Sequence, residues 1–225
     1  MSGEMFKAAR LKRGWTQAQT AARLGVSQGY ISLVERRCRP ISASLLRRAR
    51  KVLDLPATAL PLGQPHKLDS AGLAGALASL GYPGFAYLRW RARVNPAEVL
   101  AAALGSRDLE ARVVEALPWV ALEFPDLDWD WLLARVKVDD LQNRLGFVVT
   151  QARRLAEIRR NASTLARLGE VEHRLQRSRL AREDTLCHES MTLAERRWLA
   201  SHRPADAERW NLLTDLVPEE LRHAR

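Results

Sequence analysis

Residues 28 to 39 bring together side chains that can recognise the base edges and phosphates of a nucleic acid. The amide of Gln28 can pair with two groups of an adenine, and the guanidinium of Arg36 can reach a guanine or a phosphate. Leu33 can touch the methyl group of a thymine. We expect five residues to face base edges: Gln28, Tyr30, Ser32, Leu33 and Arg36. The basic cluster of Arg36, Arg37 and Arg39 would hold phosphates.

Two short helices must position these side chains. Thr16 can cap the first helix, and Gly25 stands where such a helix would end. Ser27 can cap the second helix, which we expect over residues 28 to 36. Two helices joined by three or four residues cross steeply, so the outer face of the second can enter a major groove. The apolar residues that would face each other are Ala18, Ala21, Ala22 and Leu24 on the first helix and Ile31 and Val34 on the second.

Residues 6 to 55 resemble the helix-turn-helix domain shared by the lambda repressor, Cro and the wider xenobiotic-response-element family of bacterial and phage regulators. The resemblance covers about a quarter of the chain and implies a five-helix DNA-binding domain. It rests on residues at fixed spacing: Arg10, Gly14, Thr16, Gln17, Ala22, Leu24, Gly25, Val26, Ser27, Ile31, Ser32, Glu35 and Arg39.

The resemblance also implies roles for individual residues. In the family, the glutamine at the position of Gln17 holds a backbone phosphate and supports the first residue of the recognition helix, here Gln28. The positions of Arg10 and Glu35 form an internal ion pair, which assigns Glu35 to structure and not to base reading. We expect phosphate contacts from Gln17, Ser27, Arg37 and Arg39, of which Arg37 and Arg39 belong to the basic cluster that follows the recognition helix.

Departures from the family pattern concern specificity more than fold. Gly29 lies inside the recognition helix, where it costs roughly 1 kcal/mol of helix stability relative to alanine, and it cannot hydrogen-bond a base edge. Arg37 stands where the family prefers the glycine that ends this helix. Pro40 comes one place early, so we expect the following loop to take a different path. Trp15 replaces a common leucine and is expected to fill core.

Charge supports double-stranded DNA as the partner. Residues 1 to 63 hold 12 Lys and Arg against 3 Asp and Glu, a net charge of +9. Residues 64 to 225 hold 24 against 23, a net charge of +1. Because neutralising phosphates releases counterions, basic surface supplies most of the affinity for DNA. We expect residues 1–62 to form the DNA-binding domain, 63–68 a linker, and 69–225 a domain for oligomerisation, partner binding or sensing.

Composition excludes several other classes of protein. No stretch is long and apolar enough to cross a membrane, and no signal or transit pattern is present, so a cytoplasmic location is expected. Cys38 and Cys187 lie far apart without zinc spacing, which indicates neither a disulfide scaffold nor a metal site. Phosphate-binding, dinucleotide, serine-hydrolase and zinc-protease motifs are missing, so we expect neither a cofactor nor an enzyme.

The second region is expected to be all helical. Two apolar stripes predict an antiparallel helical hairpin with its turn at residues 161–163, where Ser163 is a reasonable N-cap. The stripes are Leu141, Leu145, Val148, Ala152 and Leu155, then Leu165, Leu168, Val171 and Leu175. We expect mainly intramolecular core, with a dimer interface as the alternative. The flanking arginines indicate a solvated face or an auxiliary phosphate contact.

The sequence of the second region also predicts individual helix boundaries and core residues. A helix over residues 108 to 117 should end at Pro118. Thr192 and Glu195 form a capping-box pattern, and Trp198 and Trp210 should close the C-terminal core.

An acidic, aromatic segment occupies residues 117 to 131. Four carboxylates raise a Ca²⁺ or Mg²⁺ hypothesis, but the glycine and distal glutamate of an EF-hand are missing, so no metal is expected. We expect Asp128 or Asp130 to cap the next helix. The segment would otherwise recognise a partner or fold against the basic residues 131 to 182.

These features predict an all-α transcriptional regulator, most simply a repressor that binds an inverted repeat as a homodimer. The alternative is an antitoxin or defence-operon regulator whose residues 69–225 sequester a protein partner. A small-ligand sensor is a third interpretation, because helical bundles can contain cavities.

Overall fold

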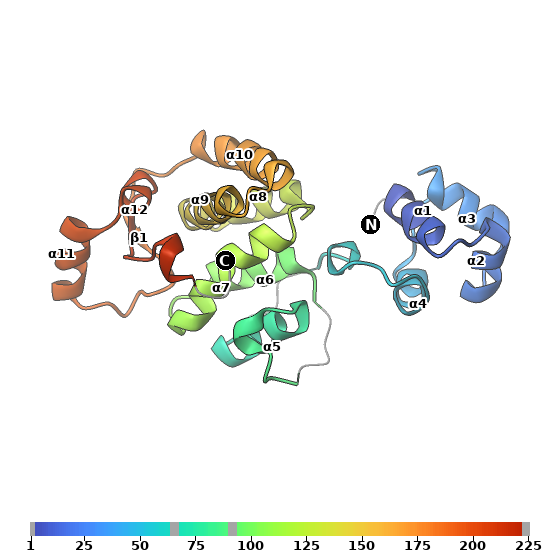
Figure 1. The fold of residues 1–225 in the computed structure, drawn as a ribbon, viewed down its shortest axis with the longest axis horizontal. Coiled ribbons are helices and arrows are strands. Elements are labelled where there is room, and N and C mark those ends of the chain that lie inside the picture. The colour runs from blue at the N-terminus through green and yellow to red at the C-terminus, as the bar shows by residue number, and fades with distance from the viewer. Residues whose placement is uncertain (1–2, 64–67, 90–93, 222–225) are drawn as a thin grey trace. The chain divides into compact units, whose positions relative to one another are not determined.

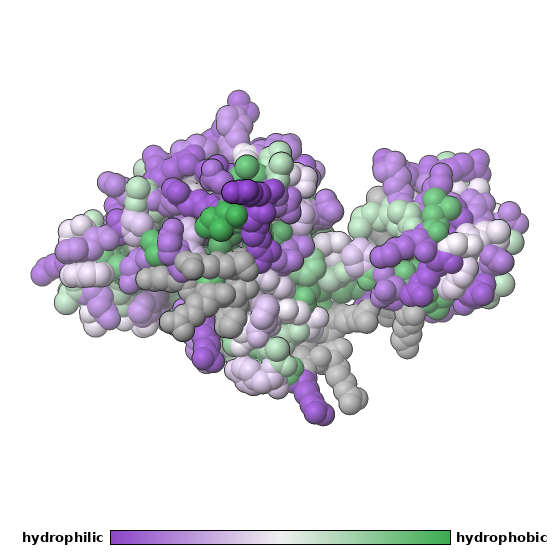
Figure 2. All heavy atoms as spheres, viewed as in Figure 1, coloured by the Kyte–Doolittle hydropathy of each residue, from purple (hydrophilic) through white to green (hydrophobic). Residues whose placement is uncertain are grey.

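The computed structural model describes residues 3–63, 68–89 and 94–221. It divides into two compact units, Met1–Gly63 (unit 1) and Gln64–Arg225 (unit 2). Both are built from helices, as Figure 1 shows, so the all-α class is confirmed. The strands within the described ranges are β1 (Asp184–Thr185) and β2 (Leu212–Leu213), which pair in parallel. The visible face of each unit is largely hydrophilic (Figure 2).

Unit 1 consists of four α-helices and a 3-10 turn over its described residues. They are α1 (Gly3–Lys12), α2 (Gln17–Leu24), α3 (Gln28–Glu35), α4 (Ala43–Leu53) and η1 (Ala57–Ala59). The fifth helical element is therefore a single 3-10 turn.

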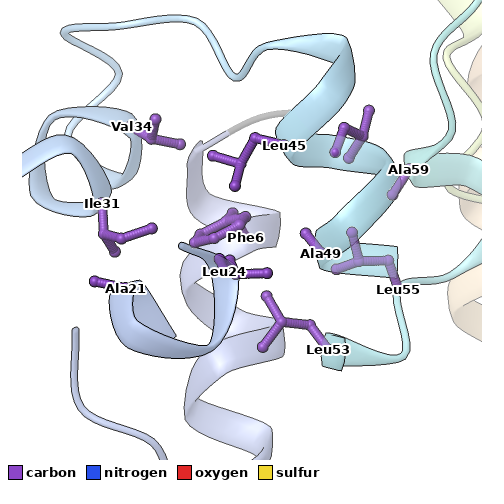
Figure 3. Close-up of a cluster of buried hydrophobic side chains, with 11 residues drawn as sticks. Phe6, Ala21, Leu24, Ile31, Val34, Leu45, Ala49, Leu53, Leu55 and Ala59 are labelled. Atoms are coloured by element: carbon purple, nitrogen blue, oxygen red, sulfur yellow. The ribbon is translucent and has the colours of Figure 1, made fainter. Parts of the chain in front are cut away.

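The core of unit 1 surrounds the fully buried ring of Phe6 (Figure 3). The residues packed around it come from α2, α3, α4 and the segment that follows: Ala21, Leu24, Ile31, Val34, Leu45, Leu46, Ala49, Leu53, Leu55 and Ala59. Helix α1 begins against the end of α3, where a Cβ on Gly3 would lie 2.1 Å from the carbonyl oxygen of Val34. A glycine is therefore required at this crossing.

Unit 2 begins with α5 (Ser70–Leu80), η2 (Pro83–Phe85), α6 (Pro96–Leu104), α7 (Ala111–Glu123) and α8 (Trp129–Val138). It continues with α9 (Gln142–Ile158), α10 (Ala162–Gln176), β1, α11 (Leu193–His202), α12 (Ala205–Arg209), β2 and η3 (Pro218–Glu220).

Helix α9 is the centre of unit 2, and it packs against α7, α8 and α10. Figure 1 shows α9 enclosed by these elements. The apolar stripe of α9 is buried from Leu145 to Leu155, so it is intramolecular core. The hairpin with α10 is present, but Asn161 and not Ser163 is the N-cap of α10: its side-chain oxygen accepts from the Thr164 N–H at 3.2 Å. The expectation of a Ser163 cap was wrong because α10 begins at Ala162.

Helix α7 continues through Pro118 to Glu123, so the expected stop at this proline was wrong. A proline inside a helix removes one hydrogen bond and costs about 3 kcal/mol. Residues on both sides of Pro118 are buried, including Leu117 and Trp119. Their burial offsets the lost bond.

The C-terminal segment is attached to α9 by polar contacts as well as apolar ones. The buried Trp210 donates its Nε1–H to the Thr150 hydroxyl at 2.8 Å, and that hydroxyl donates to Glu172 at 3.0 Å. The Glu172 carboxylate also pairs with Arg153 at 2.6 Å and Arg209 at 2.8 Å. Trp210 closes this part of the core as expected, whereas Trp198 is 52% exposed and does not.

Many arginines of unit 2 pair with carboxylates. Arg159 lies 2.5 Å from Glu123, and Arg174 lies 2.5 Å from Asp130. The acidic segment therefore folds against the basic stretch, and Asp128 caps α8 through the Trp131 N–H.

Three further expectations concern the chemistry of the described residues. No helix among them is both long and apolar enough to span a bilayer. No group of three or more His, Cys, Asp or Glu side chains in these ranges is placed to hold a metal ion. Cys38 is an exposed free thiol, and Cys187 is a buried one.

Candidate nucleic-acid interface

Helices α2 and α3 are held by local hydrogen bonds at their ends. Thr16 and Gln19 form a complete capping box at the start of α2, with bonds of 3.1 and 2.9 Å. Gly25 ends α2 in the left-handed conformation at φ 63°. The Ser27 hydroxyl then accepts the Tyr30 N–H at 3.2 Å and starts α3. These contacts fix the turn between the two helices.

Helix α3 has one buried face and one open face. Ile31, Val34 and Glu35 are buried toward α1 and α2. The residues predicted to read bases lie elsewhere on the helix: Gln28 and Arg36 are exposed, and Tyr30, Ser32 and Leu33 are half-buried. The structure thus presents an amide, a hydroxyl and a guanidinium four residues apart along the outer face.

Tyr30 is tied to the loop that follows α3. Its hydroxyl donates to the carbonyl oxygen of Pro40 at 3.3 Å and accepts the Ser42 N–H at 3.4 Å. The guanidinium of Arg39 lies over the Tyr30 ring, 5.1 Å from its centroid. The tyrosine therefore shapes the basic loop and positions Arg39.

Arg10, Gln17 and Glu35 meet beneath α3. Arg10 Nε donates to Glu35 Oε1 at 2.6 Å, and Arg10 Nη2 donates to Oε2 at 3.0 Å. Arg10 also donates to the carbonyl oxygen of Trp15 at 2.6 Å. Gln17 donates its amide to Glu35 Oε2 at 2.9 Å, which directs it to the end of α3 and not to Gln28. Three separate parts of unit 1 are joined at this carboxylate.

Arg37 ends α3 in an unusual backbone conformation. Its φ of 62° lies in the left-handed region that favours glycine. The N–H groups of Arg37 and Cys38 return to the carbonyl oxygens of Val34 and Leu33, at 3.1 and 2.9 Å, which is the Schellman pattern of helix termination. The absent glycine noted in the sequence therefore leaves a strained arginine.

The side chain of Arg37 pairs with Glu4 on α1 at 2.6 Å, although both are largely exposed. Sequence reasoning missed Glu4 because it lies far from Arg37 in the chain, and no local pattern links the two. Arg48, which belongs to the basic residues that continue the cluster along the chain, has its Nη1 3.1 Å from the position of a Cβ on Gly25, beside the turn.

Gly29 is exposed on the outer face of α3. A Cβ added there would meet nothing within 4 Å, and its φ is not in the left-handed region. Neither packing nor backbone geometry within the protein calls for a glycine at this position.

Trp15 lies at the edge of the core, half-buried, with the guanidinium of Arg23 4.3 Å from its ring centroid. Trp15 therefore packs against the edge of the core near the start of α2 and is not fully buried within it.

Comparison with known proteins agrees with this geometry. Residues 6–60 match the family model described as helix-turn-helix. Neither the curated proteins nor the solved structures contain a match to the chain. The matched segment contains α1 to α4 and η1. Residues 6–60 are thus a helix-turn-helix domain of the lambda-repressor and Cro type, carried by a DNA-binding regulator of transcription.

Proposed function

We propose that the protein is a sequence-specific repressor that binds an inverted repeat in double-stranded DNA as a homodimer. The observation that carries the proposal is the open face of α3, where Gln28 and Arg36 are exposed on a helix whose other face is buried. A major groove admits one such helix and displays a distinct hydrogen-bonding pattern for each base pair. A single module of this size buries little DNA surface, so two copies on half-sites about one helical turn apart supply the affinity.

Base reading is assigned to the outer residues of α3. Gln28 pairs with adenine, Ser32 and Arg36 follow at four-residue intervals, and Leu33 contacts a thymine methyl group. Tyr30 supports this set from the side through its bonds to Pro40 and Ser42.

Gly29, which has no side chain, lies on the same outer face of α3 as the proposed base-reading residues. Because the protein itself does not need glycine there, the absent side chain is explained by a close approach of DNA to the α3 backbone. The stability lost from the helix is then a requirement of binding.

Phosphate contacts are assigned to Ser27, Gln17, Arg39 and Arg37 around the ends of α2 and α3. Arg39 is already held over Tyr30. Arg37 must exchange the Glu4 carboxylate for a phosphate, and Gln17 must turn from Glu35 or share its amide.

The test is selection of bound DNA from random sequence, followed by gel shifts over a range of salt concentration. Enrichment of an inverted repeat, with a half-site bound more weakly, supports the proposal. Gln28→Ala should change the preferred base at one position of each half-site, whereas Arg39→Ala should weaken binding to all sequences about equally.

Arg167→Ala is the matched control, because this arginine of unit 2 is exposed and pairs with Glu170 on its own helix. It should leave the selected sequence and the affinity unchanged. Binding without sequence preference, or identical profiles for Gln28→Ala and Arg39→Ala, would refute the assignment of α3. Recovery of single half-sites alone would refute the dimer.

A further inference from the structure

Unit 2 contains a cavity of about 880 Å³ that is lined by residues of this unit alone. It lies between the start of α7, the segment after β1, helix α11 and the segment after β2. Small-molecule sites in proteins have volumes of roughly 300–1,000 Å³, so the cavity has the size of a ligand site.

The walls of the cavity are mainly apolar. Leu109 and Val114 come from the α7 side, Leu186 and Met191 from the segment after β1, and Leu199, Leu213 and Leu216 complete the lining. Trp198 adds an aromatic ring at the mouth, where it is 52% exposed. This ring is stacked on His202, with centroids 4.6 Å apart and planes within 7°. An exposed tryptophan held flat in this way offers a preformed surface to a ligand.

Three residues of the lining carry carboxylates, and its other polar side chains are Cys187, His188 and Thr214. Glu115, Glu195 and Asp215 line the cavity, and no lysine or arginine is present among the described residues that do so. The Thr192 hydroxyl and N–H both donate to Glu195 at 2.7 Å. These bonds lower the pKa of Glu195 from its ordinary value.

One wall of the cavity is firm. The buried Arg144 donates two hydrogen bonds to Asp184, at 2.7 and 2.8 Å, and reaches the carbonyl oxygens of Leu104 and Ser106 at 2.9 and 3.0 Å. These bonds fix the start of the segment that contains Leu186 and Met191.

The part of the lining formed by α11 has few buried contacts with the rest of unit 2. Of its residues, Leu199 alone is buried, and it packs with Met191 and Leu213 in a small cluster. Leu193 is 74% exposed. Figure 1 shows α11 at the outer end of unit 2, beyond β1 and α12. A helix with so few contacts can adjust to an occupant and gain buried surface from it.

We propose that this cavity binds a small organic cation with an aromatic or branched apolar body. The apolar lining takes the body of the ligand, and the three carboxylates favour a positive charge over a neutral or negative one. Trp198 adds a cation–π contact at the mouth.

The test uses the full chain and two probes of nearly the same shape, the cation methyltriphenylphosphonium and the neutral triphenylphosphine oxide. Isothermal titration should give one site per chain, with a dissociation constant at least about tenfold lower for the cation than for the neutral probe. Because residues 1 to 63 carry +9 of the net charge of +10, adventitious binding of a cation to unit 1 is disfavoured. Equal affinities for the two probes, or no binding of the cation, would overturn the proposal.

Variants locate the site. The double substitution Glu115→Gln with Asp215→Asn should remove most of the preference for the cation, and Trp198→Ala should weaken both probes. Glu170→Gln is the matched control, because this exposed glutamate lies on α10 and outside the cavity. Circular dichroism of each variant verifies folding. Cation binding that is unchanged by the double substitution and by Trp198→Ala, in folded proteins, would also overturn the proposal.

Discussion

Arg10 and Glu35 form a buried two-point ion pair that joins α1 to the last turn of α3. Their side chains are 8% and 3% exposed. Burial acts to raise the pKa of Glu35, but hydrogen bonds from Arg10 and Gln17, together with the charge of Arg10, outweigh it and leave the pKa below the ordinary value of 4.5.

The stabilisation from Glu35 should therefore depend on pH. A carboxyl group whose pKa is lower in the folded state stabilises the protein fully above about pH 4.5 and progressively less as the pH falls through the folded pKa. We expect hydrogen exchange of α2 and α3 to accelerate in this acidic range. Glu35→Gln should be less stable by about 3 kcal/mol at neutral pH and should lose this part of the acid response.

Asp54→Asn provides the comparison for Glu35→Gln, because Asp54 is 73% exposed and lies 4.0 Å from Arg13. It should behave as the wild type. A wild-type acid response retained in Glu35→Gln would show that the ion pair does not control the stability of α2 and α3.

Substitutions of Arg37, the left-handed residue at the end of α3, should change the stability of unit 1 and its affinity for DNA in different ways. Arg37→Gly should stabilise unit 1 by about 1 kcal/mol, because a side chain is disfavoured at φ 62°. Arg37→Ala keeps the strain and should not stabilise. Both should weaken DNA binding and lower the salt dependence by about one counterion. Stability is measured by hydrogen exchange and affinity by gel shift. Equal stability of Arg37→Gly and Arg37→Ala would show that the backbone of Arg37 is not strained.

Gly29→Ala should increase the stability of unit 1 and decrease its affinity for DNA. The added Cβ meets open space in the free protein, so the helix should gain about 1 kcal/mol. The same methyl group would stand between α3 and DNA, so affinity should fall. Gly169→Ala on α10 is the control, since its Cβ also meets nothing within 4 Å; it should stabilise without changing DNA affinity. Unchanged affinity in Gly29→Ala would remove the argument for close approach.

Gly146 on α9 is required by the indole of Trp210. A Cβ on this glycine would lie 2.3 Å from Trp210 Cζ3, and the ring is fully buried. Gly146→Ala should therefore destabilise unit 2 by about 1–3 kcal/mol, because the indole must move and its bond to Thr150 must lengthen. Thermal unfolding followed by tryptophan fluorescence measures the effect. If Gly146→Ala were as stable as Gly169→Ala, the core around Trp210 could accommodate the added methyl group without cost.

Local features were predictable from the sequence. The caps at Thr16, Ser27 and Thr192 and the end of α2 at Gly25 were anticipated, because each involves residues within a few positions of one another. The all-α class and the resemblance of residues 6 to 55 to a helix-turn-helix domain are confirmed, the family match covering residues 6–60. Both were predictable because periodicity and fixed spacing are properties of the chain itself.

Features that depend on distant partners were not predictable. Tyr30 is polar at one end and lies on the recognition helix, yet its hydroxyl bonds to Pro40 across a loop. Trp198 is a large apolar residue, yet it stays exposed because α11 lies at the margin of unit 2. Pro118 does not end α7 because buried neighbours on both sides outweigh one missing hydrogen bond. The assignments of base and phosphate contacts remain predictions.

The pairing of arginines with carboxylates in unit 2 affects which unit of the protein binds polyanions other than DNA. Arg144, Arg153, Arg159 and Arg174 each already hold an acidic side chain, whereas unit 1 has 12 cationic residues and 3 anionic ones. Heparin, RNA or an acidic column matrix should therefore bind the protein through unit 1. A chain anchored in this way keeps its second unit available to the surroundings while the first is occupied.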